Sequence, residues 1–107
     1  MKYTGTWYID EMELWDEDYF NMDVRAYITI GKSRTGEFQF GLVSGDIDGK
    51  IIRSAETERF EFTWSGSDES DAASGSGWIK LKDEQTIEGM IKFHMGDSSG
   101  FLAKRAE

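Results

Sequence analysis

The sequence predicts an all-β protein whose short antiparallel strands form a meander that closes, or nearly closes, into a small barrel. Apolar residues recur at every second position in several segments, so each segment has one apolar and one wetter face. Turns rich in glycine, aspartate and serine separate these segments. The connections leave no room for the long helical crossovers of a parallel sheet. A β-sandwich is the alternative architecture.

We expect about eight strands, at 3–9, 24–30, 37–43, 50–55, 58–64, 78–82, 86–94 and 100–105. The two-residue period is clearest in the second, third, fifth and seventh of them, where the apolar face includes Val24, Leu42 and Met95. From this period we predict which side chains line the core. They are Ile28, Phe38, Phe40, Phe60, Phe62, Trp64, Ile91 and Phe93.

Turn-forming residues separate the predicted strands. Reversals are expected at 31–36, at 83–84 and at 96–100, and an Asp48-Gly49 pair predicts a tight hairpin at 46–49. Residues 65–77 are small and polar, and thirteen such residues predict a long loop. Because the strand pattern resumes at Trp78, we assign the whole chain, 1–107, to a single β domain.

Residues 10–23 interrupt the two-residue period. Met12, Trp15, Tyr19 and Met22 lie at helical spacing, which would place one apolar stripe on an acidic helix. The alternative is that the first strand continues to Leu14 and that only 16–22 forms a short helical segment. We favour the second interpretation because short isolated helices are marginal.

The same segment is the main candidate for function. It holds seven carboxylates and no basic residue, whereas the rest of the chain is close to neutral within a total charge of −9. Such a concentration of charge speeds the approach of a basic protein, and aromatic residues supply anchors. The predicted partner-binding residues are Glu13, Trp15, Asp16, Glu17, Asp18 and Tyr19. The alternative is a solvated acidic face whose aromatic rings cover one end of the barrel.

Composition excludes several other classes of site. The chain has no cysteine and one histidine, which rules out a thiolate nucleophile, a disulfide framework and a Cys/His zinc site. No apolar run reaches the ~20 residues of a membrane span. A net charge of −9 disfavours binding to nucleic acid. The first residues lack the pattern of a secretory signal, and the absence of cysteine fits the cytoplasm, so we expect a cytoplasmic protein.

Two further groups of residues are candidate sites. Asp46 and Asp48, and the carboxylates of 65–77, lack the spacing of a calcium loop, so we predict no metal or other cofactor. A hydrolase centred on His94, with Asp97 and Ser98 or Ser99, would need a geometry that proximity in sequence does not supply. We therefore predict no catalytic residues and no enzymatic activity.

Two resemblances add to these expectations. Gly5-Thr6-Trp7 near the start and Lys104-Arg105 near the end resemble the pattern of lipocalins and calycins. That resemblance implies a barrel whose base is closed by Trp7, with Arg105 stacked on the indole. A small-molecule ligand inside the barrel is the corresponding alternative function, although an eight-stranded barrel can also be filled by its own side chains.

The wider resemblance is to an uncharacterised family of short acidic bacterial proteins. The segments that carry it are Met12–Tyr19, Gly36–Gly41, Trp64–Asp71, Gly77-Trp78 and His94–Asp97. It implies a bacterial, single-domain, cytoplasmic protein and no particular activity. Taken together, the sequence predicts a non-enzymatic acidic binding protein, of inhibitor or immunity type, whose partner is a basic protein.

Overall fold

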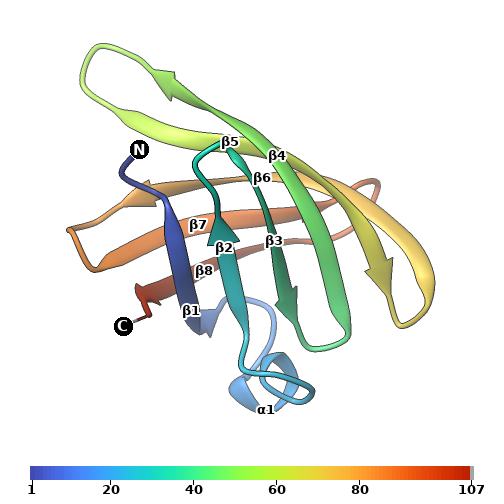
Figure 1. The fold of residues 1–107 in the computed structure, drawn as a ribbon. Coiled ribbons are helices and arrows are strands. Elements are labelled where there is room, and N and C mark those ends of the chain that lie inside the picture. Colours follow the sequence, from blue (N-terminus) through green and yellow to red (C-terminus); the bar gives the residue numbers. More distant parts are fainter. Residues whose placement is uncertain (107) are drawn as a thin grey trace.

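The computed structural model describes residues 1–106. In it, eight antiparallel strands close into a barrel (Figure 1). Each strand pairs with the next one along the chain, and β8 pairs with β1. The strands are β1 (Gly5–Met12), β2 (Tyr27–Ile30), β3 (Thr35–Phe40), β4 (Val43–Arg53), β5 (Glu58–Asp68), β6 (Asp71–Leu81), β7 (Thr86–Phe93) and β8 (Ser98–Arg105). The predicted all-β barrel is therefore confirmed.

The up-and-down order places alternate connections at opposite ends of the barrel. We call one the Trp15 end; its connections are 13–26, 41–42, 69–70 and 94–97. The other is the Trp7 end; it holds residues 1–4 and the connections 31–34, 54–57 and 82–85. The single helix of the described residues, α1 (Glu17–Phe20), lies in the first connection of the Trp15 end (Figure 1).

The prediction of a long loop at 65–77 is wrong. β5 and β6 pair from Phe60 with Ile79 to Asp68 with Asp71, so these small polar residues form the outer part of a long hairpin. Glu69 and Ser70 form its turn with φ angles of 50° and 77°, as in the tight turns that match the twist of a hairpin. Small residues here permit close strand contact: a Cβ on Gly75 would collide with the backbone of Lys92.

The hairpin predicted at 46–49 is also wrong. Asp48 and Gly49 lie within β4 and both pair with β5, and the chain reverses earlier, at Gly41 and Leu42. Gly41 takes a φ of +57°, and the Tyr19 ring packs where a Cβ would stand. Glycine is thus required at 41 both by the turn and by the helix beside it.

The short helical segment is confirmed, in the smaller of its two predicted forms. α1 spans four residues, and the Asp16 side chain accepts a hydrogen bond from the Tyr19 backbone N–H at 3.1 Å, which caps the helix. β1 ends at Met12, two residues before the predicted limit at Leu14. After the helix, the Asn21 side chain accepts from the Ala26 N–H at 2.8 Å, and β2 begins only at Tyr27. Val24 is consequently exposed rather than part of a strand.

The predicted core is present. Seven of the eight predicted residues are buried, and Phe93, the last residue of β7, is half-buried at the rim under Trp15. The Phe38 ring packs against two other rings in the interior. Its centroid lies 5.9 Å from that of Phe40 and 5.1 Å from that of Trp64. The expectation that Met95 shares this apolar face is wrong, because β7 ends at Phe93 and Met95 lies in the turn that follows.

The Trp7 end is closed as the sequence pattern implied. Trp7 is fully buried, its indole N–H donates to the Tyr3 carbonyl at 3.0 Å, and the Arg105 guanidinium lies 4.1 Å from the ring centroid. Gly5 has a φ of +126°, and a Cβ there would lie 3.0 Å from the Arg105 Nη1. The spacing Gly-x-Trp therefore has a physical reason: the glycine leaves room for the cation that covers the indole.

Candidate functional site

The two ends of the barrel differ in charge. The connections of the Trp15 end carry seven carboxylates and, within the described chain, His94 and one lysine or arginine, Arg25, whose guanidinium lies 3.9 Å from the Tyr8 ring centroid. The carboxylates are those of Glu13, Asp16, Glu17, Asp18, Asp23, Glu69 and Asp97. The connections of the Trp7 end carry Lys2, Lys32, Arg34 and Lys82 against Glu56, Asp83 and Glu84. The excess of negative charge therefore lies at the Trp15 end.

The aromatic residues of the predicted partner-binding segment cover the barrel at this end. The Trp15 ring lies 5.2 Å from the Phe40 ring, 6.0 Å from Tyr19 and 6.2 Å from Phe93, between centroids. Both Trp15 and Tyr19 are half-buried. Both rings pack against the core with part of each exposed, as expected if the aromatic rings cover one end of the barrel, and partner binding by these residues stays a prediction.

The acidic residues of the segment are exposed. Asp16 caps the helix, and Glu17 and Asp18 form its first turn, where negative charge suits the helix dipole. The Glu13 carboxylate accepts from the Gly100 N–H at 3.3 Å, which joins the segment to β8. These contacts order the chain around 13–19 while leaving its charges in solvent.

A hollow of about 370 Å³ opens beside Trp15, between the β5–β6 and β7–β8 turns. The residues that line it include Asp68, Asp71, Asp97 and His94. The backbone N–H of His94 donates to the Ser74 carbonyl at 2.7 Å, which ties one turn to the other hairpin. The sequence did not predict that these four residues share one hollow, because a loop at 65–77 leaves the position of Asp71 undefined. The long hairpin of β5 and β6 places Asp71 at the same hollow as His94.

The two serines of the candidate hydrolase group, Ser98 and Ser99, lie in different environments. Ser99 is buried; its hydroxyl donates to the Gly100 carbonyl at 3.0 Å and accepts from the Leu14 N–H at 3.2 Å. Ser98 lines a groove on the outer wall, and His94 is exposed in its turn. The Ser99 hydroxyl is thus part of the backbone support of residues 13–14.

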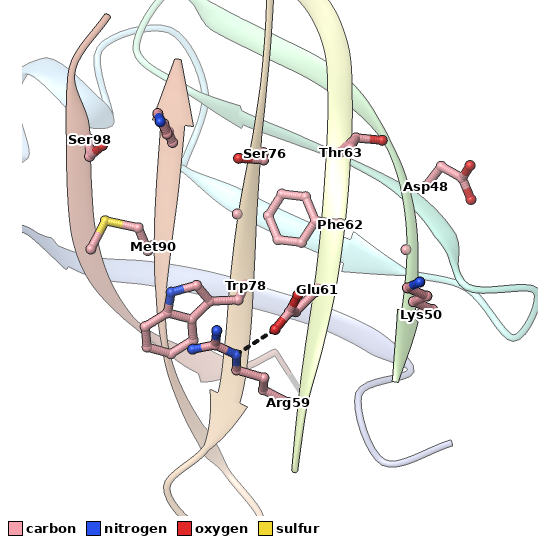
Figure 2. A pocket seen from close by; sticks show the side chains of 13 residues that line it. Asp48, Lys50, Arg59, Glu61, Phe62, Thr63, Ser76, Trp78, Met90 and Ser98 are labelled. Atoms are coloured by element: carbon pink, nitrogen blue, oxygen red, sulfur yellow. Dashed lines mark hydrogen bonds and ion pairs between the residues drawn. The ribbon is translucent and has the colours of Figure 1, made fainter. Parts of the chain in front are cut away.

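The outer wall carries a groove of about 710 Å³ across β4 to β8 (Figure 2). Its apolar lining includes Trp78, Met90 and Phe62, as Figure 2 shows, and the Arg59 guanidinium lies 4.9 Å from the Trp78 ring centroid. Glu61 holds Arg59 in place by accepting from its Nε at 2.8 Å. The groove combines an indole, hydroxyl groups and charged groups, an arrangement able to hold a small polar ligand.

Two other features bear on the class of protein. Within residues 1–106, no three histidine or acidic side chains are grouped so that they could bind a metal ion. In the same residues, no helix has the length and apolar character needed to span a membrane.

Comparison with known proteins gave no relative. The chain matches no family model, no curated protein and no solved structure. Both resemblances drawn from the sequence, to lipocalins and to short acidic bacterial proteins, therefore stay predictions.

Proposed function

We propose that this protein is a non-enzymatic acidic binding protein that engages a basic protein partner through the Trp15 end of its barrel. The observation that carries the proposal is the asymmetry of charge between the two ends. Seven carboxylates in the connections of the Trp15 end are exposed. Within the described chain, these connections hold one lysine or arginine, Arg25. Clustered charge of one sign steers a partner of the opposite sign and raises the rate of association.

The partner-binding residues in this proposal are those predicted from the sequence. Asp16, Glu17 and Asp18 supply exposed charge on a capped helix, and Trp15 and Tyr19 present the free part of rings that the core already holds in place. Ordered aromatic side chains lose little entropy when a partner covers them. Inhibitor or immunity proteins of basic enzymes are the functional type that this arrangement fits, and a bacterial cytoplasm is the setting that we propose.

Small-molecule binding inside the barrel has less support. The inward side chains Phe40, Phe60 and Phe62 are at most 4% exposed, and neighbouring rings contact one another along the interior. A barrel of eight strands filled in this way uses its interior as a core.

The proposal is tested with a set of three neutralised carboxylates and a matched control set. The test protein carries Asp16→Asn, Glu17→Gln and Asp18→Asn, and asparagine at 16 keeps a side-chain cap on α1. The control carries Asp46→Asn, Asp48→Asn and Glu56→Gln, three exposed residues away from the Trp15 end. Both sets change the net charge equally, so they differ only in place.

Immobilised protein is incubated with extract of the source cells at low salt, and any retained protein is purified and titrated against each variant. We expect the set at 16–18 to weaken binding about tenfold, mainly through slower association, and the control set to change it less than about twofold. An equal loss with both sets, or no retained basic protein at low salt, would refute the proposal.

A further inference from the structure

The Trp15 end also holds nearly all of the large apolar side chains that the described residues expose. Leu14 is 48% exposed and Met22 56%, and Val24 lies in the same connection. Leu42 forms the β3–β4 turn, and Met95, in the β7–β8 turn, is 92% exposed. The sixth such residue, Met1, lies at the other end. Single exposed apolar residues are ordinary, whereas here five of the six lie at one end of the barrel.

Met95 is held outward by an ordered turn. Its φ of +59° is a left-handed conformation, which is unfavourable for a residue with a Cβ. The turn is closed by hydrogen bonds from the Gly96 N–H to the Phe93 carbonyl at 3.0 Å and from the Phe93 N–H to the Asp97 carbonyl at 2.9 Å. The side chain therefore projects from a defined position, and methionine adapts its shape to an apolar partner.

Acidic groups lie next to these apolar side chains. Met95 lies between His94 and Gly96, in the turn that also holds Asp97, and His94 and Asp97 line the hollow of about 370 Å³ together with Asp68 and Asp71. Leu42 is joined to the β5–β6 turn by a hydrogen bond from the Glu69 N–H to its carbonyl at 3.1 Å. Met95 thus lies in the turn that holds Asp97, and Leu42 lies beside the turn that holds Glu69.

We propose that the Trp15 end is a composite docking surface for a segment that is both cationic and apolar, such as an amphipathic basic helix of a partner protein. Apolar side chains of that segment pack on Leu42 and Met95, and its lysine or arginine side chains pair with the carboxylates of the hollow. This inference rests on the proposed function and adds the chemistry of the partner's contact. Buried apolar contact supplies the affinity that exposed ion pairs alone do not give.

Charge decides between the possible occupants. A second copy of this chain would bring the same carboxylates against each other, and the phosphates of a nucleic acid or an anionic lipid surface would be repelled as well. A cationic segment gains from the same charges. The surface thus fits a basic protein, and the apolar side chains require that its contact residues be amphipathic.

The test uses two synthetic peptides of equal charge, each titrated by calorimetry. One is an 18-residue lysine–leucine peptide that forms an amphipathic helix, and the other replaces every leucine by serine. We expect the lysine–leucine peptide to bind at least about tenfold more tightly. The variants Leu42→Ser and Met95→Ser should each remove a large part of this difference, whereas Met1→Ser, at the other end, should leave it unchanged.

The outcomes separate the inference from the proposed function. Equal affinity for the two peptides, or loss of the difference in Met1→Ser as much as in Met95→Ser, overturns the inference. Binding of the lysine–serine peptide that depends on Asp16, Glu17 and Asp18 would still support the proposed function in that case. If neither peptide binds at low salt, both fail. All three positions are exposed, so the variants should fold. Circular dichroism checks that they do.

Discussion

Both ends of the barrel are closed by a tryptophan, and the two tryptophans are held in different ways. Trp7 is fully buried, donates a hydrogen bond to a carbonyl and is covered by Arg105. Trp15 is half-buried and packs on the rings of Tyr19, Phe40 and Phe93. The first arrangement uses the whole side chain for stability, whereas the second leaves part of the ring, and the charges around it, for contact with another molecule.

The largest expected difference between the ends is in stability. Trp7→Ala should lower the free energy of unfolding by about 4 kcal/mol, because it leaves a cavity at a fully buried site. Trp15→Ala should cost about half as much, because its ring is already partly hydrated. Urea unfolding followed by circular dichroism measures both. Equal losses would show that the two ends contribute alike and would remove the contrast. If Trp7→Ala does not fold, Trp7→Phe serves in its place.

A smaller effect is expected from the cation over Trp7. The Arg105 guanidinium donates to the carbonyls of Thr4 at 2.9 Å, Lys2 at 3.1 Å and Glu84 at 3.2 Å, so it joins the two termini to the 82–85 turn. Arg105→Met should cost about 2 kcal/mol of stability through these lost hydrogen bonds.

Arg105→Lys is the matched control for charge. Lysine keeps the positive charge but lacks the planar fork of donors, so it should restore less than half of the loss. Full recovery with lysine would mean that charge alone closes this end. Thermal unfolding of the three proteins at one pH gives the comparison.

The smallest effect concerns acid sensitivity of the Trp7 end. Hydrogen bonds from the Gln85 and Thr86 N–H groups to Asp83 hold the pKa of this carboxyl below its ordinary value. The charged form is thus favoured in the folded protein, and its contribution is present above the ordinary pKa and is lost as the pH falls through the lowered one. The stability difference between the protein and Asp83→Asn should be constant near neutral pH and shrink below about pH 4. A difference that does not change with pH would contradict this assignment.

Local patterns in the sequence were enough to predict the elements that have a strong two-residue period. Phe38 and Phe40, and Phe60 and Phe62, face the core as expected, because alternation in a strand leaves a side chain only two directions. Arg105 lies over Trp7, a contact that was implied only by the resemblance to lipocalins and not by strand alternation. The acidic segment was likewise visible as a run of charge.

The composition of 65–77 misled the prediction, because small polar residues have little strand propensity of their own. They form β5 and β6 because pairing with β4 and β7 on either side satisfies their backbone, and because only glycine fits at positions such as Gly66 and Gly75. This pairing joins residues that are far apart in the chain, so the local sequence does not predict it.

What the sequence determined by itself is therefore the class of fold, the core face of each strongly alternating strand and the presence of an acidic, aromatic segment. Only the tertiary structure decided which residues, far apart in the chain, come together at each end of the barrel. Closure of the barrel brings Met95, Leu42 and Asp71 to the same end as Trp15, although they are far apart in the chain. The physical reason is that strand alternation is a local property, whereas the composition of a barrel end depends on which turns the up-and-down order collects there.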